Sequence, residues 1–61
     1  MSLFVIVRED GQYAAEPGAE HSYTRKLEEA WTFTSRDKAW PHALRNESVR
    51  DVREILRRPL S

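Results

Sequence analysis

The sequence predicts a small α+β domain in which a three-stranded antiparallel sheet, made of an N-terminal hairpin plus a third strand, packs with one kinked helix and a short C-terminal helix. Three observations predict this fold. A continuous β-branched and aromatic run, Leu3 to Val7, is typical of a strand. The Asp10-Gly11 pair that follows it is typical of a hairpin turn. Apolar residues then recur at helical spacing in the second half of the chain. Its 61 residues fit a single domain, 1–61.

The first strand is apolar at every position from Leu3 to Val7. Side chains on both faces of the sheet therefore favour burial, which predicts a central strand covered on both sides. Asp10-Gly11 supplies residues that tolerate positive φ, and Gln12-Tyr13-Ala14-Ala15 follows as the second strand. Pro17-Gly18 predicts a loop with positive φ at the glycine.

Two short elements are expected between the loop and the main helix. Thr24 can accept a hydrogen bond from the first free N–H groups of a helical turn or two over Arg25 to Ala30, with Leu27 and Ala30 facing inward. Trp31-Thr32-Phe33 then alternates apolar and polar residues. This alternation predicts the third strand, with its two aromatic residues on the core face.

The main helix is expected to begin at Thr34-Ser35-Arg36-Asp37. This stretch has the form of a capping box, with a hydroxyl at the N-cap and an acid three residues later. An apolar stripe follows, made of Ala39, Trp40, Ala43 and Leu44. Pro41 removes one backbone donor, so it is expected to kink the helix or split it in two before an end near Arg45-Asn46.

The tail from Glu47 to Ser61 fits two structures. Val49, Val52, Ile55 and Leu56 share a helical face, while Ser48-Val49-Arg50 also suits a short strand. We favour a helix from about Asp51 to Arg58, ended by Pro59. In this helix Glu54 pairs with Arg50 and Arg58 at four-residue spacing.

Composition narrows the function classes. Ten basic and ten acidic side chains give a formal net charge of zero, so no overall charge steers the molecule to nucleic acid or membrane. Residues 1–30 carry three basic and six acidic groups, net −3, and residues 31–61 carry seven and four, net +3. No apolar run reaches the roughly 20 residues of a membrane span, and the start MSLFVIVRED lacks the features of a signal peptide. We therefore expect a cytoplasmic protein.

The order of turn, cap and core residues from about residue 3 to residue 47 carries a resemblance. The residues are Tyr13, Pro17-Gly18, Ser22-Tyr23-Thr24, Leu27, Ala30, Phe33, Ser35, Ala39 and Asn46-Glu47. On them the chain resembles a loose group of small, mostly uncharacterised proteins encoded by bacteriophages and prophages. The resemblance implies a compact α+β miniprotein made in the cytoplasm of an infected or lysogenic bacterial host cell, where such proteins sometimes bind and block host machinery. It carries over no functional residue, and Pro41 and the ending Ile55-Leu56-Arg57-Arg58 depart from the pattern.

No residue pattern points to catalysis, a metal or a cofactor. His21 and His42 belong to no H-x-x-x-H or H-E-x-x-H pattern. There is no G-x-S-x-G elbow, no cysteine and no glycine-rich phosphate loop. Glu28 and Glu29 are adjacent, so on a helix they would point about 100° apart and could not easily act as an acid/base pair. We expect a protein that is not an enzyme and that holds no metal or cofactor.

Trp31 and Trp40 are the strongest apolar anchors, because tryptophan buries a large area and is enriched both in cores and at interface hot spots. In so small a chain the core is the default place for both. Trp40, between Ala39 and Pro41, is expected at the edge of the core, which makes it a candidate for contact with a partner.

Basic side chains form the second candidate surface. Arg50, Arg53 and Arg57 fall at i, i+3 and i+7 and would share one helix face, with Arg58 beside them. Such a face can follow the phosphates of a nucleic acid, although Asp51 and Glu54 interrupt it and no aromatic residue is interleaved for base stacking. An acidic protein surface would fit it equally well, and a merely solvated face is the simplest interpretation.

These features favour a small non-enzymatic interaction protein of the phage type that binds a host or phage protein. A homodimer is expected, because the first strand is apolar on both faces and no disulfide or metal stabilises the small core. The candidate partner-binding residues are Trp40, Arg50, Arg53, Arg57 and Arg58. The alternative is a small nucleic-acid-binding protein that uses the C-terminal arginine-rich face.

Overall fold

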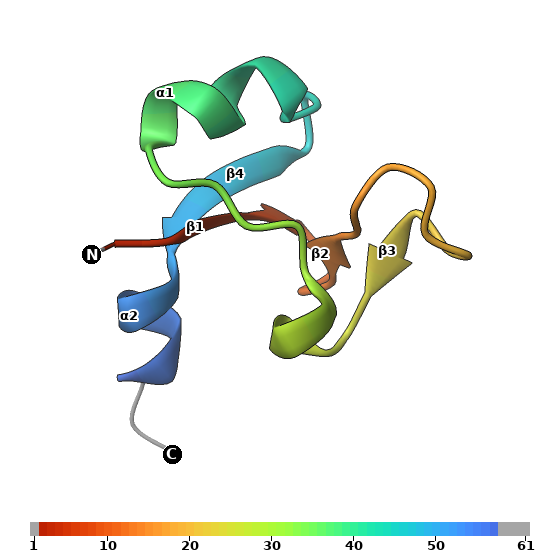
Figure 1. Cartoon of the computed structure of the whole chain (residues 1–61), viewed down its shortest axis with the longest axis horizontal. Coiled ribbons are helices and arrows are strands. Elements are labelled where there is room, and N and C mark those ends of the chain that lie inside the picture. Colours follow the sequence, from red (N-terminus) through yellow and green to blue (C-terminus); the bar gives the residue numbers. More distant parts are fainter. Residues whose placement is uncertain (1, 58–61) are drawn as a thin grey trace.

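The computed structural model describes residues 2–57. These residues form an antiparallel sheet of four strands in the order β3-β2-β1-β4, and not the three-stranded sheet that the sequence predicts. The strands are β1 (Phe4–Arg8), β2 (Tyr13–Ala14), β3 (Tyr23–Thr24) and β4 (Glu47–Asp51). The helices are α1 (Arg36–Ala39) and α2 (Val52–Leu56), with 3₁₀ helices η1 (Leu27–Glu29) and η2 (Trp40–His42). Figure 1 shows α1 on one side of the sheet and α2 on the other, and the α+β class is as expected.

The N-terminal hairpin forms as predicted. Arg8 N–H donates to the Gln12 carbonyl at 2.7 Å, and Gly11 N–H donates to the Arg8 carbonyl at 2.9 Å. Gly11 has φ 93° and Gly18 has φ 91°, so both glycines occupy the conformation that other residues avoid. β1 lies between β2 and β4, which makes it the central strand that its apolar sequence indicates.

The predicted strand Trp31 to Phe33 is wrong. Phe33 instead makes an isolated bridge with Phe4, and Trp31 N–H donates to the Ala14 carbonyl at 2.9 Å. β2 already pairs with the second half of β1 at Val7, so only the start of β1 is open to this segment. The expected core side chains are nevertheless in place, because Phe33 is buried and Trp31 packs against the core.

The expected helical turn after Thr24 is shorter than predicted. It is the 3₁₀ helix η1, whose N-cap residue Lys26 provides no side-chain cap. Thr24 belongs to β3, and its hydroxyl accepts from Lys26 N–H at 3.1 Å. Ala30 is buried and forms a bridge with Ala15, so it faces inward as expected.

The main helix begins one residue later than the capping box predicts and ends earlier. Ser35, not Thr34, is the N-cap, and its hydroxyl accepts from Lys38 N–H at 3.3 Å. Pro41 splits the helix: α1 ends at Ala39 and the chain continues as η2, in which Pro41 follows Trp40. Ala43 is extended, so the helix does not reach Arg45-Asn46.

The tail contains both of its candidate structures in succession. Glu47–Asp51 forms β4, where Val49 lies opposite Ile6, and α2 follows directly. Asp51 caps α2 by accepting from Arg53 N–H at 2.8 Å. The helix favoured over the whole of Asp51 to Arg58 is therefore limited to Val52–Leu56, and Arg58 and Pro59 lie outside the described residues.

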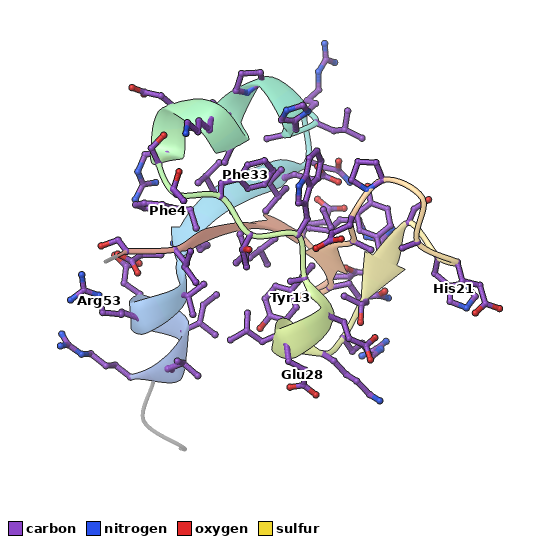
Figure 2. The ribbon with its side chains drawn as sticks, viewed as in Figure 1. Phe4, Tyr13, His21, Glu28, Phe33 and Arg53 are labelled. Atoms are coloured by element: carbon purple, nitrogen blue, oxygen red, sulfur yellow. The ribbon has the colours of Figure 1, made fainter. Side chains whose placement is uncertain are left out.

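The main core lies between the sheet and α1. Its buried cluster consists of Ile6, Phe33, Ala39 and Val49, with Phe4, Ala14, Trp31 and Ala43 packed against it. We call the sheet surface that carries Ile6 and Val49 the core face; Phe4 and Phe33 lie there in Figure 2. Because side chains alternate along a strand, Val5 and Val7 point to the opposite surface, which we call the second face.

None of the helices within residues 2–57 combines the length and the apolar character that crossing a membrane requires.

Candidate functional site

Trp40 lies at the surface, next to the core. Its side chain is 53% exposed, whereas the preceding Ala39 is completely buried. Leu44, beyond the other end of η2, is 61% exposed. We call Trp40 and Leu44 the Trp40 patch. Large apolar side chains held in water next to a rigid core are the kind of feature that marks a contact with another molecule.

The second tryptophan and its neighbours form part of the core packing. The rings of Trp31 and Phe33 have centroids 4.6 Å apart, and the ring of His42 lies 4.7 Å from Trp31. His42 also stacks on Phe33 at 5.6 Å with an interplanar angle of 20°. His42 is itself exposed, and its ring lies against this aromatic cluster.

Basic side chains on α1 lie beside the Trp40 patch in the sequence. Arg36 and Lys38 are exposed, and Asp37 between them is the one acidic residue of this helix. Arg36 has a second role, because one of its guanidinium nitrogens donates to the Val49 carbonyl at 3.1 Å and the group lies 5.2 Å from the Phe4 ring centroid. Arg36 therefore occupies a backbone acceptor of β4, the last strand of the sheet.

The predicted arginine face is not formed as one helix face. Arg50 lies on β4, whereas Arg53 and Arg57 belong to α2 and its C-cap. Arg53 donates to the Ser2 hydroxyl at 2.7 Å, and Figure 2 shows its side chain at the end of the molecule far from His21. Arg50 instead borders a groove with Glu54. The expected Glu54–Arg50 pair is not among the ion pairs of residues 2–57, and Arg58 lies outside the described residues.

A groove opens on the second face of the sheet. Its volume is about 580 Å³, and Val7, Tyr13, Ser48 and Ile55 contribute to its lining. Tyr13 lies on the same side of the sheet as α2 in Figure 2. Val5, on the same face, is completely buried, so the second face is covered at one end of β1 and open at the other. We call this feature the second-face groove.

A polar network that sequence reasoning missed joins the two ends of the sheet. The Tyr23 hydroxyl donates to one carboxylate oxygen of Glu47, and the other oxygen accepts from Leu44 N–H at 3.0 Å. The Arg8 guanidinium lies 3.9 Å from the Tyr23 ring centroid and donates to Asp10 at 3.1 and 2.6 Å. No spacing rule links Tyr23 to Glu47, because the contact depends on the strand order.

The network shifts the acid–base behaviour of its members. Hydrogen bonds from the Arg8 side chain and from Gln12 N–H lower the pKa of Asp10 to about 2. The hydrogen bond that Tyr23 donates to Glu47 raises the pKa of Tyr23, since ionisation would remove the donor and place two negative charges together. Both shifts follow from contacts that hold strands and turns in place, so the network is structural.

Acidic side chains border a separate hollow near β3 and η1. Its lining includes Glu16, Glu20, Glu28 and Glu29, and its volume is about 440 Å³. Among residues 2–57 no three or more histidine and carboxylate side chains are arranged to hold a metal ion. The hollow is a negative surface of the half of the chain that is acidic in sequence.

Comparison of the chain with protein-family models, with curated protein sequences and with solved structures gives no match.

Proposed function

We propose that this chain is a small non-enzymatic interaction protein of the phage or prophage type that binds a host or phage protein in the bacterial cytoplasm and acts as a homodimer. The observation that carries the proposal is the exposure of Trp40, which is 53% exposed, together with that of Leu44, which follows four positions later and is 61% exposed. The chain has only two tryptophans, and the other one is packed in the aromatic cluster.

The position of Trp40 suits an anchor residue. Its backbone belongs to both the end of α1 and the start of η2, and Ala39 before it is completely buried. An anchor on a rigid backbone loses little conformational entropy on binding, which favours affinity. Aromatic residues with apolar neighbours and an arginine nearby are typical of binding hot spots between proteins.

Charge adds a preference for the partner. On α1, which directly precedes Trp40, the basic residues Arg36 and Lys38 outnumber the acidic residue Asp37, so this surface favours a partner with acidic groups at the edge of its contact. Such groups would increase the rate of association more than the final affinity, and their effect would weaken with salt.

Nucleic-acid binding through the C-terminal arginines is the weaker candidate. Arg53 and Arg57 are one helical turn apart on α2, but Arg50 is on a strand and Asp51 and Glu54 lie between them. No aromatic side chain from α2 is available for base stacking. The arrangement offers a few separate phosphate contacts at most.

Capture from bacterial lysate with and without nuclease tests the proposal. We expect the tagged chain to retain a specific protein after nuclease treatment, and Trp40→Ala to reduce its recovery at least tenfold, as loss of a hot spot would. Leu56→Ala is the matched control, because Leu56 is 70% exposed on α2. Recovery that requires nucleic acid, or that Trp40→Ala leaves unchanged, would contradict the proposal.

A further inference from the structure

We infer that the second-face groove is the surface through which two copies of this chain associate. This inference rests on the homodimer in the proposed function and specifies where its interface lies. The Trp40 patch follows α1 in the chain, and Figure 1 shows α1 and α2 on opposite sides of the sheet. The patch therefore stays available for a different partner.

β1, the central strand, is incompletely covered on the second face of the sheet. β1 is apolar from Phe4 to Val7, and a strand of this kind is stable when both of its faces are covered. On the second face Val5 is 0% exposed, but Val7 is only half-buried and lines the groove. α2 has five residues and is too short to cover the whole face. A second copy would complete the cover.

Apolar side chains form part of the groove lining. Val7, Tyr13 and Ile55 come from β1, β2 and α2, and each is half-buried in the single chain. Protein interfaces usually combine apolar side chains with polar groups in this way.

Acidic and basic side chains are balanced in number along the second-face groove. Three acidic and three basic side chains line it. Arg8 and Glu47 are held by Asp10 and Tyr23, and no ion pair joins the other four, Glu9, Arg45, Arg50 and Glu54, to one another within residues 2–57. A balanced border suits neither a polyanion nor a strongly acidic partner. It is complementary to itself when a two-fold axis brings each acidic group toward a basic group of the other copy.

The size of the chain is consistent with such an interface. A standard interface covers about 800 Å² on each partner. That is about one sixth of the 4907 Å² surface of this chain. Within residues 2–57 the single chain buries six apolar residues, Val5, Ile6, Ala30, Phe33, Ala39 and Val49. For a core this small, self-association is one of the few available sources of stability.

The free side of β4 is a poorer site for a second copy. A strand of a second copy could pair there only with the backbone N–H and C=O groups of β4 that face away from β1. The Val49 carbonyl already accepts from Arg36 at 3.1 Å, and the Arg36 side chain lies against the edge of the sheet. The two copies are therefore expected to meet face to face.

The dissociation constant of the dimer, measured by sedimentation equilibrium for matched variants, tests the inference. Ile55→Glu places a charge in the groove and should raise the dissociation constant about 30-fold or more. Leu44→Glu makes the same kind of change at a side chain 61% exposed outside the groove, and it should leave the constant within about twofold. Circular dichroism checks that both variants fold. Equal effects of the two variants, or a larger effect of Leu44→Glu, would overturn the inference.

A second measurement needs no substitution, so it locates the dimer interface even if Ile55→Glu does not fold. Equal amounts of isotope-labelled and unlabelled chain are mixed, and NMR contacts between copies are recorded. We expect them from Val7, Tyr13 and Ile55. Contacts from Trp40 and Leu44 instead, or contacts from the groove to residues 58–61 of the same copy, would overturn the inference. A stable monomer would overturn the homodimer as well, while Trp40-dependent capture of a protein would still support the interaction function.

Discussion

Glu47 connects three parts of the molecule through one carboxylate. It starts β4, accepts the Tyr23 hydroxyl from β3, and closes the turn before it by accepting from Leu44 N–H at 3.0 Å. Glu47 N–H also donates to the Leu44 carbonyl at 3.0 Å, so the two residues are bonded reciprocally. The turn between η2 and β4 is thereby fixed where the chain changes from helix to strand.

Tyr23→Phe should lower the free energy of unfolding by about 1.5 kcal/mol, because it removes a hydrogen bond to a charged group and leaves the ring under Arg8. Tyr13→Phe is the matched control, since its hydroxyl makes no hydrogen bond within residues 2–57; we expect a change below about 0.5 kcal/mol. Urea unfolding of both variants measures the difference. Equal losses would show that the Tyr23–Glu47 contact does not stabilise the fold.

The Arg8–Asp10 pair predicts a specific dependence on acid. Its contacts lower the pKa of Asp10 from 3.8 to about 2, so the folded chain holds the charged form more strongly than the unfolded chain. The resulting stability is present above the unfolded pKa and is lost as the pH falls through about 2. The stability difference between wild type and Asp10→Asn should therefore shrink as the pH is lowered from 5 to 2. Urea unfolding across this range measures it, with Glu9→Gln as control, and a constant difference for Asp10→Asn would contradict the assignment.

At the scale of elements, α1 is a single turn and depends on its cap. The Ser35 hydroxyl satisfies Lys38 N–H at 3.3 Å, whereas the Thr34 hydroxyl only accepts from the end of the exposed Lys38 side chain. The helix is short because Pro41 follows, and Ala39 is the residue through which it reaches the core.

Ser35→Ala should cost about 1 kcal/mol of stability, the usual value for a lost N-cap. Thr34→Ala, at the neighbouring hydroxyl, should cost less than half of that, since a contact with an exposed lysine contributes little. Thermal unfolding compares the two variants. A larger loss for Thr34→Ala would mean that the helix begins where the capping box in the sequence places it.

Local signals predicted the elements that depend on neighbouring residues. Gly11 and Gly18 adopt the positive φ expected from their turns, and β1 forms where its apolar run lies. The errors concern pairing between distant segments. Ser48-Val49-Arg50 fits a strand or a helix equally well in isolation, and its place beside β1, opposite residues more than forty positions away, makes it a strand. Trp31 to Phe33 had a strand pattern, but only the start of β1 was free to pair with it, so Phe33 forms a single bridge with Phe4.

The sequence predicted the candidate site only in part. Trp40 was expected at the edge of the core, between Ala39 and Pro41, and it is 53% exposed there. The arginine face was predicted wrongly, because that prediction assumed one helix running through Arg50. In the structure Arg50 belongs to β4. The second-face groove had no sequence signal beyond the apolar β1, since its lining comes from β1, β2, β4 and α2 together.

At the scale of the molecule, the sheet separates two surfaces of different character. α1, which precedes the Trp40 patch, carries more basic than acidic side chains. The second-face groove is lined by equal numbers of acidic and basic side chains. Figure 1 shows the sheet lying between α1 and α2. This arrangement would let one chain bind a second copy and a partner at the same time, and two copies would present two Trp40 patches to a partner.

The molar mass of the unaltered chain in solution, followed by light scattering as its concentration increases, tests the central claim most directly. We expect a mass that rises from 7.2 kDa for one chain toward twice that value, with the midpoint at micromolar concentration. A mass that stays at 7.2 kDa up to millimolar concentration would contradict it.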